Sequence, residues 1–203
     1  MHEIFRATRV IPVLTIERVA DAVPLARALA LGGLTVLEVT LRTKAAAAAI
    51  SAIGREVPEI VVGAGTVLRA ADVTQALAAG ARFLVSPGLT PEVAAAGLAS
   101  DVPYLGGVMT PSEIMLARGL GLSFLKFYPA SAAGGVAALR NYAAVFAGVA
   151  FCPTGGVTAD SAPEYLALPN VPMVGGAWMA PPEAIAAGDW AGITERARRA
   201  SAL

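Results

Sequence analysis

The sequence predicts a (β/α)₈ barrel formed as a single domain over residues 1–203. Short, continuously apolar runs rich in Val, Ile, Leu and Phe recur along the chain, and Ala- and Leu-rich stretches with helical periodicity separate them. Eight such pairs in 203 residues leave about 25 residues for each strand and helix, near the lower size limit of this fold. No linker or change of composition marks a second domain.

Each predicted strand is too short and too apolar for a surface helix. Such runs are typical of parallel strands that are buried on both faces. The runs are, in chain order, 10–14, 35–39, 60–62, 83–85, 102–105, 124–127, 149–152 and 171–174.

The stretches between the strands have the periodicity of amphipathic helices. Several begin with Pro in the first turn and several end at Gly, as helices commonly do. Clear examples are 20–31, 70–79, 91–98, 111–120, 136–146 and 181–200. An open doubly wound sheet shares this alternation, but no Gly-x-Gly-x-x-Gly fingerprint follows the first strand, and eight repeats favour a closed barrel.

The composition indicates which classes of binding partner the protein has. The formal net charge is zero with a pI near 6.6, so no excess of basic residues indicates binding to nucleic acid or an anionic membrane. Charged residues make up only 15% of the chain, against about 25% in ordinary soluble domains, which predicts a homo-oligomer with surface buried between subunits. The first residues lack the apolar core of a signal peptide, and we expect a cytoplasmic protein with small-molecule partners.

The scarcity of cysteine and histidine excludes several kinds of site. Cys152 is the sole cysteine and His2 the sole histidine. We therefore expect no disulfide, no Ser-His-Asp triad, no metal and no cofactor.

Lys126 stands inside an apolar run and is one of only two lysines among 15 basic residues. Burial disfavours the charged ammonium, so the neutral amine becomes accessible and can form a Schiff base with a carbonyl substrate. Arg cannot supply this chemistry. The alternative is a lysine whose stem covers apolar surface while its head reaches water.

Polar residues at the carboxyl ends of strands are the other candidates, because barrel enzymes form their sites there. Glu38 lies near the end of the second strand, Arg42 follows it by four residues, and Thr66 follows the third strand. Burial favours the protonated carboxyl of Glu38 while a positive neighbour favours the carboxylate, a balance that suits proton transfer. A structural Glu38–Arg42 ion pair and a helix-capping role for Thr66 are the alternatives.

Glycine-rich turns follow three of the later predicted strands, at the same end of the predicted barrel as Glu38 and Thr66. They comprise residues 86–88, residues 154–156, and the pair Gly175 and Gly176. The last two turns follow strands seven and eight, where barrels commonly bind phosphate through backbone N–H groups. Plain chain reversal is the alternative.

Together these residues suit the cleavage of a carbon–carbon bond in a phosphorylated 2-keto acid. A protonated imine on Lys126 serves as the electron sink. Glu38 removes a hydroxyl proton and later returns a proton to the enamine. Arg42 and Thr66 grip the carboxylate.

Seven motifs spread over nearly the whole chain carry a family resemblance. They are IPV at 11–13, LTVLEVTLRT at 34–43, VGAGTVL at 62–68, SPGL at 86–89, FLKFYPA at 124–130, FCPTGGV at 151–157 and GGAW at 175–178. With them the chain closely resembles the 2-keto-3-deoxy-6-phosphogluconate (KDPG) aldolases, class I aldolases of the Entner–Doudoroff pathway. Members often also cleave 4-hydroxy-2-oxoglutarate (KHG).

The resemblance implies a homotrimer of barrels that needs no metal and releases pyruvate together with glyceraldehyde 3-phosphate or glyoxylate. It implies Lys126 as the Schiff-base lysine, Glu38 as the general acid and base, and Arg42 with Thr66 as the grip on the pyruvyl carboxylate. It further implies Pro87 and Phe127 as pocket residues, and Thr154, Gly155 and Gly156 toward the phosphate-bearing end.

The chain departs from the family at several places. Ala177 stands where a hydroxyl residue is usual, Gly106 and Gly107 replace a Pro-Gly pair, residues 45–49 are all alanine, and only nine residues precede the first strand, where an extra helix is usual. One alternative is thus an engineered or drifted variant used as an assembly scaffold. Another is a phosphate-binding barrel isomerase that uses Glu38 without covalent chemistry.

Overall fold

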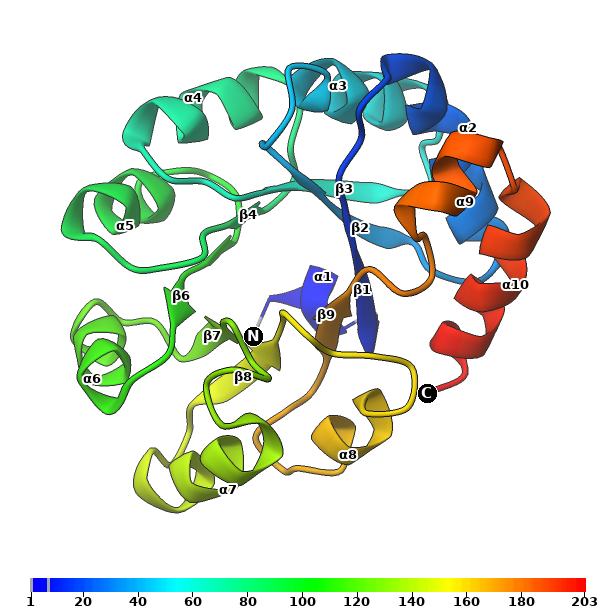
Figure 1. The fold of residues 1–203 in the computed structure, drawn as a ribbon. Coiled ribbons are helices and arrows are strands. Elements are labelled where there is room, and N and C mark those ends of the chain that lie inside the picture. Colours follow the sequence, from blue (N-terminus) through cyan, green and yellow to red (C-terminus); the bar gives the residue numbers. More distant parts are fainter. Residues whose placement is uncertain (1, 7) are drawn as a thin grey trace.

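The computed structural model describes residues 2–6 and 8–203 and confirms the (β/α)₈ barrel (Figure 1). Parallel strands form the inner wall, and the helices form a ring around it. The strands are β1 (Val10–Leu14), β2 (Val36–Thr40), β3 (Val61–Gly65), β4 (Leu84–Val85), β5 (Tyr104–Leu105), β6 (Gly107–Val108), β7 (Phe124–Phe127), β8 (Ala150–Pro153) and β9 (Val174–Gly176).

The strands close on themselves. They pair in the orders β5-β4-β3-β2-β1-β9 and β6-β7-β8. The Lys126 N–H donates to the Gly106 carbonyl at 2.9 Å, and a parallel bridge between Thr154 and Gly175 joins β8 to β9. The open doubly wound sheet is therefore wrong. Only Gly106 separates β5 from β6, and the two together occupy one barrel position, so nine labels occupy eight positions. The sequence predicted a strand at 102–105 and none at 107–108.

The helices lie where the periodicity predicts, with differences at the two ends of the chain. They are α1 (Glu3–Arg6), α2 (Val19–Leu31), α3 (Ala46–Glu56), α4 (Ala70–Ala78), α5 (Pro91–Leu98), α6 (Pro111–Gly119), α7 (Gly135–Val145), α8 (Ala162–Leu166), α9 (Pro182–Ala187) and α10 (Trp190–Ser201). Within the described residues, none is long and apolar enough to cross a membrane.

Two predicted elements differ from the structure. The single helix expected at 181–200 is two helices, because Gly188 adopts a left-handed φ of 66° and Asp189 caps the second one by accepting from the Gly192 N–H. The last strand begins at Val174, where it meets Val10 of β1, because the residues before it form a turn. The alanines at 45–49 mostly belong to α3.

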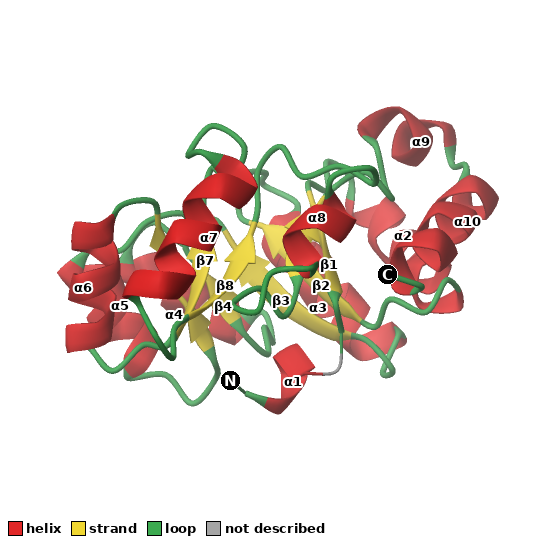
Figure 2. Cartoon of the chain, turned by 90° about the horizontal axis from the view of Figure 1, so that it is seen from below, coloured by secondary structure: helices red, strands yellow, loops and turns green. Residues whose placement is uncertain are grey.

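The end of the barrel where the strands begin is closed by α1, although the sequence predicted no helix there (Figure 2). Phe5 is buried, and its ring lies 5.3 Å from the ring of Phe83 and 5.4 Å from that of Phe124. These rings belong to an apolar cluster inside the barrel that also holds Ile11 and Val36.

Side chains that point into the barrel recur at every second strand residue. Above the apolar cluster, β1, β2 and β7 place Val13, Glu38 and Lys126 at one level. Two residues further along each strand, the next level holds Thr15, Thr40 and Tyr128. The closed lower end and polar upper levels orient the site toward the carboxyl ends of the strands.

The role of α1 as a plug can be tested by Phe5→Ala. Removing a buried aromatic side chain typically lowers the free energy of unfolding by about 3–5 kcal/mol. We expect a loss of this order in urea denaturation, whereas Arg6→Ala, at an exposed position of the same helix, should change it by less than about 0.5 kcal/mol. Equal, small effects of both variants would show that α1 does not contribute to stability.

Candidate active site

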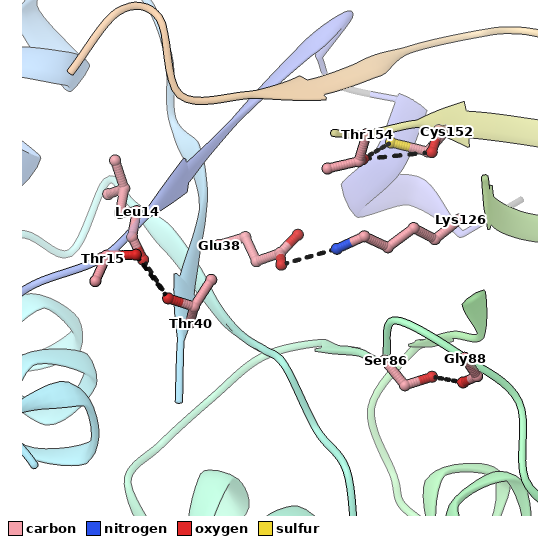
Figure 3. Close-up of polar contacts among 9 residues, drawn as sticks. All are labelled: Leu14, Thr15, Glu38, Thr40, Ser86, Gly88, Lys126, Cys152 and Thr154. Carbon is pink, nitrogen blue, oxygen red and sulfur yellow. Dashed lines mark hydrogen bonds and ion pairs between the residues drawn. The ribbon is translucent and has the colours of Figure 1, made fainter. Parts of the chain in front are cut away.

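A buried ion pair lies at the centre of the candidate site. Lys126 Nζ on β7 is 3.3 Å from Glu38 Oε1 on β2, and the two residues are only 5% and 4% exposed (Figure 3). Gly65 of β3 makes room for this pair, since a side chain there would collide with the Glu38 carboxylate. Lys126 Nζ also lies 5.4 Å from the centre of the Tyr128 ring.

The pairing of Glu38 differs from the structural alternative that the sequence left open. Its ion-pair partner is Lys126, and the described residues show no ion pair between Glu38 and Arg42. Arg42 lines the same cavity, and no acidic side chain of the described residues lies within ion-pair distance of it. Its guanidinium is therefore available for an anion at the mouth.

Lys126 lines a cavity of about 310 Å³ at the carboxyl ends of the strands, whereas Glu38 contacts Lys126 without lining the cavity itself. Its wall contains six of the residues that the sequence singled out: Arg42, Lys126, Thr154, Gly155, Gly156 and Gly176. The other residues that line it are Val13, Thr15, Tyr128, Val157, Ala177 and Trp178. Gly175 lies behind Thr154, where an added Cβ would come within 2.5 Å of the Thr154 hydroxyl oxygen.

Phe127 does not line this cavity. Its side chain is fully buried on the outer face of β7, where its ring packs 6.0 Å from that of Tyr142 and 6.4 Å from that of Phe151. Tyr128 faces the cavity instead. The alternation of side chains along a strand could have predicted this, because Lys126 and Tyr128 share one face of β7 and Phe127 lies on the other. By the same alternation, Thr15 shares the inward face of Val13.

Thr66 and Pro87 do not line the cavity. Thr66 directly follows β3 with a left-handed φ of 59°, a strained conformation for a β-branched residue that is often found at functional sites. It does not cap a helix, because the N-cap residue of α4 is Arg69. Gly107 allows the backbone of Pro87 to approach β6, where any side chain would collide with it.

A buried hydroxyl pair fixes the turn at 86–88. Ser86 Oγ lies 2.6 Å from the Gly88 carbonyl and 2.7 Å from the Tyr104 hydroxyl. Because the carbonyl can only accept, Ser86 donates to it and Tyr104 donates to Ser86. Burial raises the pKa of Tyr104, which keeps this proton in place.

The glycine turn after β8 has the features of an anion site. Gly155 and Gly156 adopt left-handed φ values of 92° and 76°. The N–H of Gly155 faces the Gly175 carbonyl across the bridge between Thr154 and Gly175, whereas no acceptor is found among the described residues for the N–H groups of Gly156 and Ala177. Unpaired backbone N–H groups at a cavity wall are suited to a phosphate or carboxylate.

Cys152 lies beside this centre but is not a second nucleophile. Its Sγ is 3.8 Å from Thr154 Oγ1, and burial raises the pKa of the thiol to about 12. It thus remains protonated at neutral pH. The described residues contain no group of three His, Cys, Asp or Glu side chains that could hold a metal ion.

Comparison with known proteins shows which family the chain belongs to. Residues 1–196 match the family model described as "Aldolase: KDPG and KHG aldolase". The chain belongs to this family.

Three of its relatives illustrate the similarity. The chain is 48% identical to the KHG/KDPG aldolase of Escherichia coli K12 over 94% of this chain and 90% of that protein. It superposes with a TM-score of 0.95, at 46% identity and over 98% and 96% of the two chains, on the KDPG aldolase of Legionella pneumophila, solved with pyruvate captured as a covalent carbinolamine intermediate. It superposes with a TM-score of 0.93, at 50% identity and over 98% and 93%, on the KDPG aldolase of Zymomonas mobilis ZM4, solved with 3-phosphoglycerate.

Proposed function

We propose that the chain is a class I aldolase that cleaves KDPG to pyruvate and glyceraldehyde 3-phosphate, and KHG to pyruvate and glyoxylate. The observation that carries the proposal is the buried pair of Lys126 and Glu38, 3.3 Å apart, in which Lys126 lines the cavity. A lysine in contact with a carboxylate can lose its proton locally, and the same carboxylate is then placed to handle protons on a substrate bound to that lysine.

The reaction begins at the amine. Glu38 accepts a proton from Lys126, and the neutral amine attacks the C2 carbonyl of the substrate to form a carbinolamine. Glu38 then returns that proton to the hydroxyl that departs as water, which leaves Glu38 as a carboxylate and gives the protonated imine, which withdraws electrons from the neighbouring carbon.

Cleavage and proton return follow from the same two residues. Glu38 removes the proton of the C4 hydroxyl, the C3–C4 bond breaks, and its electron pair moves into the imine to give an enamine while the aldehyde leaves. Glu38 returns its proton to C3, and water hydrolyses the imine to release pyruvate and free Lys126. No external oxidant, reductant or metal is needed for this balance.

The remaining residues bind the two ends of the substrate. Arg42, with no ion-pair partner among the described residues, and Thr66 hold the pyruvyl carboxylate, while Pro87 supports the turn beside it. The N–H groups of Gly156 and Ala177, near Thr154, hold the phosphate. Gly175 and Gly176 keep the adjacent wall open, and Tyr128 takes the pocket role that the sequence had given to Phe127.

Lys126→Arg tests the covalent mechanism, because Arg keeps the charge and lacks a deprotonable amine. We expect cleavage of KDPG to fall by at least about 10³-fold, with no pyruvate adduct after borohydride reduction. The matched control is Lys44→Arg, which replaces the only other lysine at an exposed position and should keep both signals. An isomerase without covalent chemistry, or an inactive scaffold, would give no adduct even in the unmodified protein.

Glu38→Gln tests the proton shuttle. The substitution keeps the shape of the side chain and removes proton transfer, which typically costs about 10²- to 10⁴-fold. Exchange of the pyruvate methyl protons with deuterated water, followed by NMR, should slow by this factor, whereas Glu59→Gln at an exposed position should not affect it. Unchanged exchange in Glu38→Gln would assign the shuttle to another group.

We also infer a homotrimer that works in the cytoplasm on phosphorylated metabolites. Five of the exposed large apolar side chains lie on α5, on α6, between them, or directly after α6: Leu98, Met109, Met115, Leu116 and Leu120. The two helices are neighbours in the ring (Figure 1). An apolar surface of this kind is typical of a subunit interface.

Light scattering measures the oligomeric state directly. We expect a mass three times the 20.5 kDa of one chain. Met115→Glu, which places a charge at a residue that is 65% exposed, should lower that mass. A single-chain mass for the unmodified protein would exclude the trimer.

A further inference from the structure

We infer that Thr15 selects the substrate by accepting a hydrogen bond from the C5 hydroxyl of KDPG, the hydroxyl next to the phosphate-bearing carbon. The inference deepens the proposed function and rests on it. It concerns a residue that lines the cavity but takes no part in forming the imine or moving its protons.

A hydrogen-bond relay determines the direction in which Thr15 can act. Thr15 Oγ1 lies 3.2 Å from Thr40 Oγ1, which lies 2.9 Å from the Leu14 carbonyl (Figure 3). A hydroxyl has one proton and a carbonyl only accepts, so Thr40 donates to Leu14 and Thr15 donates to Thr40. Thr15 has then used its proton, and its free lone pair makes it an acceptor toward the cavity.

The position of Thr15 matches one carbon of the substrate. Strand β1, which ends at Leu14, lies between β2, which carries Glu38, and β9, which leads to Ala177 and the phosphate-binding wall. Glu38 takes the C4 hydroxyl proton, and the N–H groups of Gly156 and Ala177 hold the phosphate on C6. The C5 hydroxyl must therefore pass the end of β1.

This direction of hydrogen bonding favours one of the two substrates. KDPG offers a hydroxyl proton at C5, which an acceptor can bind. KHG has a carboxylate carbon at that position, and its oxygens would meet the lone pair of Thr15 without a proton between them. Thr15 thus favours the phosphorylated substrate although Ala177 contributes no side-chain hydroxyl.

Thr15→Val tests the inference, because Val keeps the branched shape and removes the oxygen. We expect the ratio of kcat/KM for KDPG to that for KHG to fall by about 3- to 10-fold, the range for loss of one neutral hydrogen bond. Thr15→Ser should retain the original ratio. Thr43→Val is the matched control, since Thr43 is a nearby threonine that donates to the Ile16 carbonyl at 2.6 Å and does not line the cavity.

A 5-deoxy analogue of KDPG separates the hydrogen bond from a general disturbance of the site. With this analogue, Thr15→Val should lose no more activity than Thr15→Ser. Equal losses on KDPG, its 5-deoxy analogue and KHG would overturn the assignment of Thr15, and so would an unchanged ratio. Borohydride trapping of pyruvate by the unmodified protein tests the proposed function separately. A failure of the aldolase mechanism would appear as a missing adduct, and a failure of the Thr15 assignment as an unchanged kcat/KM ratio.

Discussion

The whole site depends on one constraint, which is that a lysine and a glutamate share the closed interior of a barrel. Removing an ion from water costs several kcal/mol, and a buried ion left without its partner is strongly destabilising. Lys126 and Glu38 must therefore be held in contact from separate strands, β7 and β2. Barrel closure supplies that contact, and the aromatic cluster around Phe5 closes the end below it.

Missing side chains shape the site as much as present ones. The absence of a Cβ at Gly65 admits the Glu38 carboxylate, and at Gly107 it admits the backbone of Pro87. Left-handed φ values at Gly155 and Gly156 turn the chain at the cavity wall, where the N–H of Gly156 has no acceptor among the described residues. At Gly65 and Gly107 the space that a Cβ would fill is already occupied, so an alanine there would displace the Glu38 carboxylate or the Pro87 backbone.

Chemistry and selectivity occupy different levels of the barrel. In the proposed mechanism, the level that holds Lys126 and Glu38 acts on any 2-keto acid with a hydroxyl at C4, whereas the level above it, with Thr15 and Tyr128, contacts the part of the substrate that differs between KDPG and KHG. The same proposal assigns binding of the anion to backbone donors near Gly156, which do not depend on side chains. Changes such as the alanine at 177 can then alter substrate preference while the reacting pair stays in place.

Sequence alone predicted the barrel and most of its strands, because apolar periodicity is a local signal. It also singled out Lys126 and Glu38, which the structure places in contact. It did not determine the break at Gly106, the plug formed by α1, or which of Phe127 and Tyr128 faces the cavity. Nor did it show the acceptor role inferred for Thr15. Those features depend on how closure sets the inward face of each strand and the register between strands, and on which polar groups then meet, so only the tertiary structure decided them.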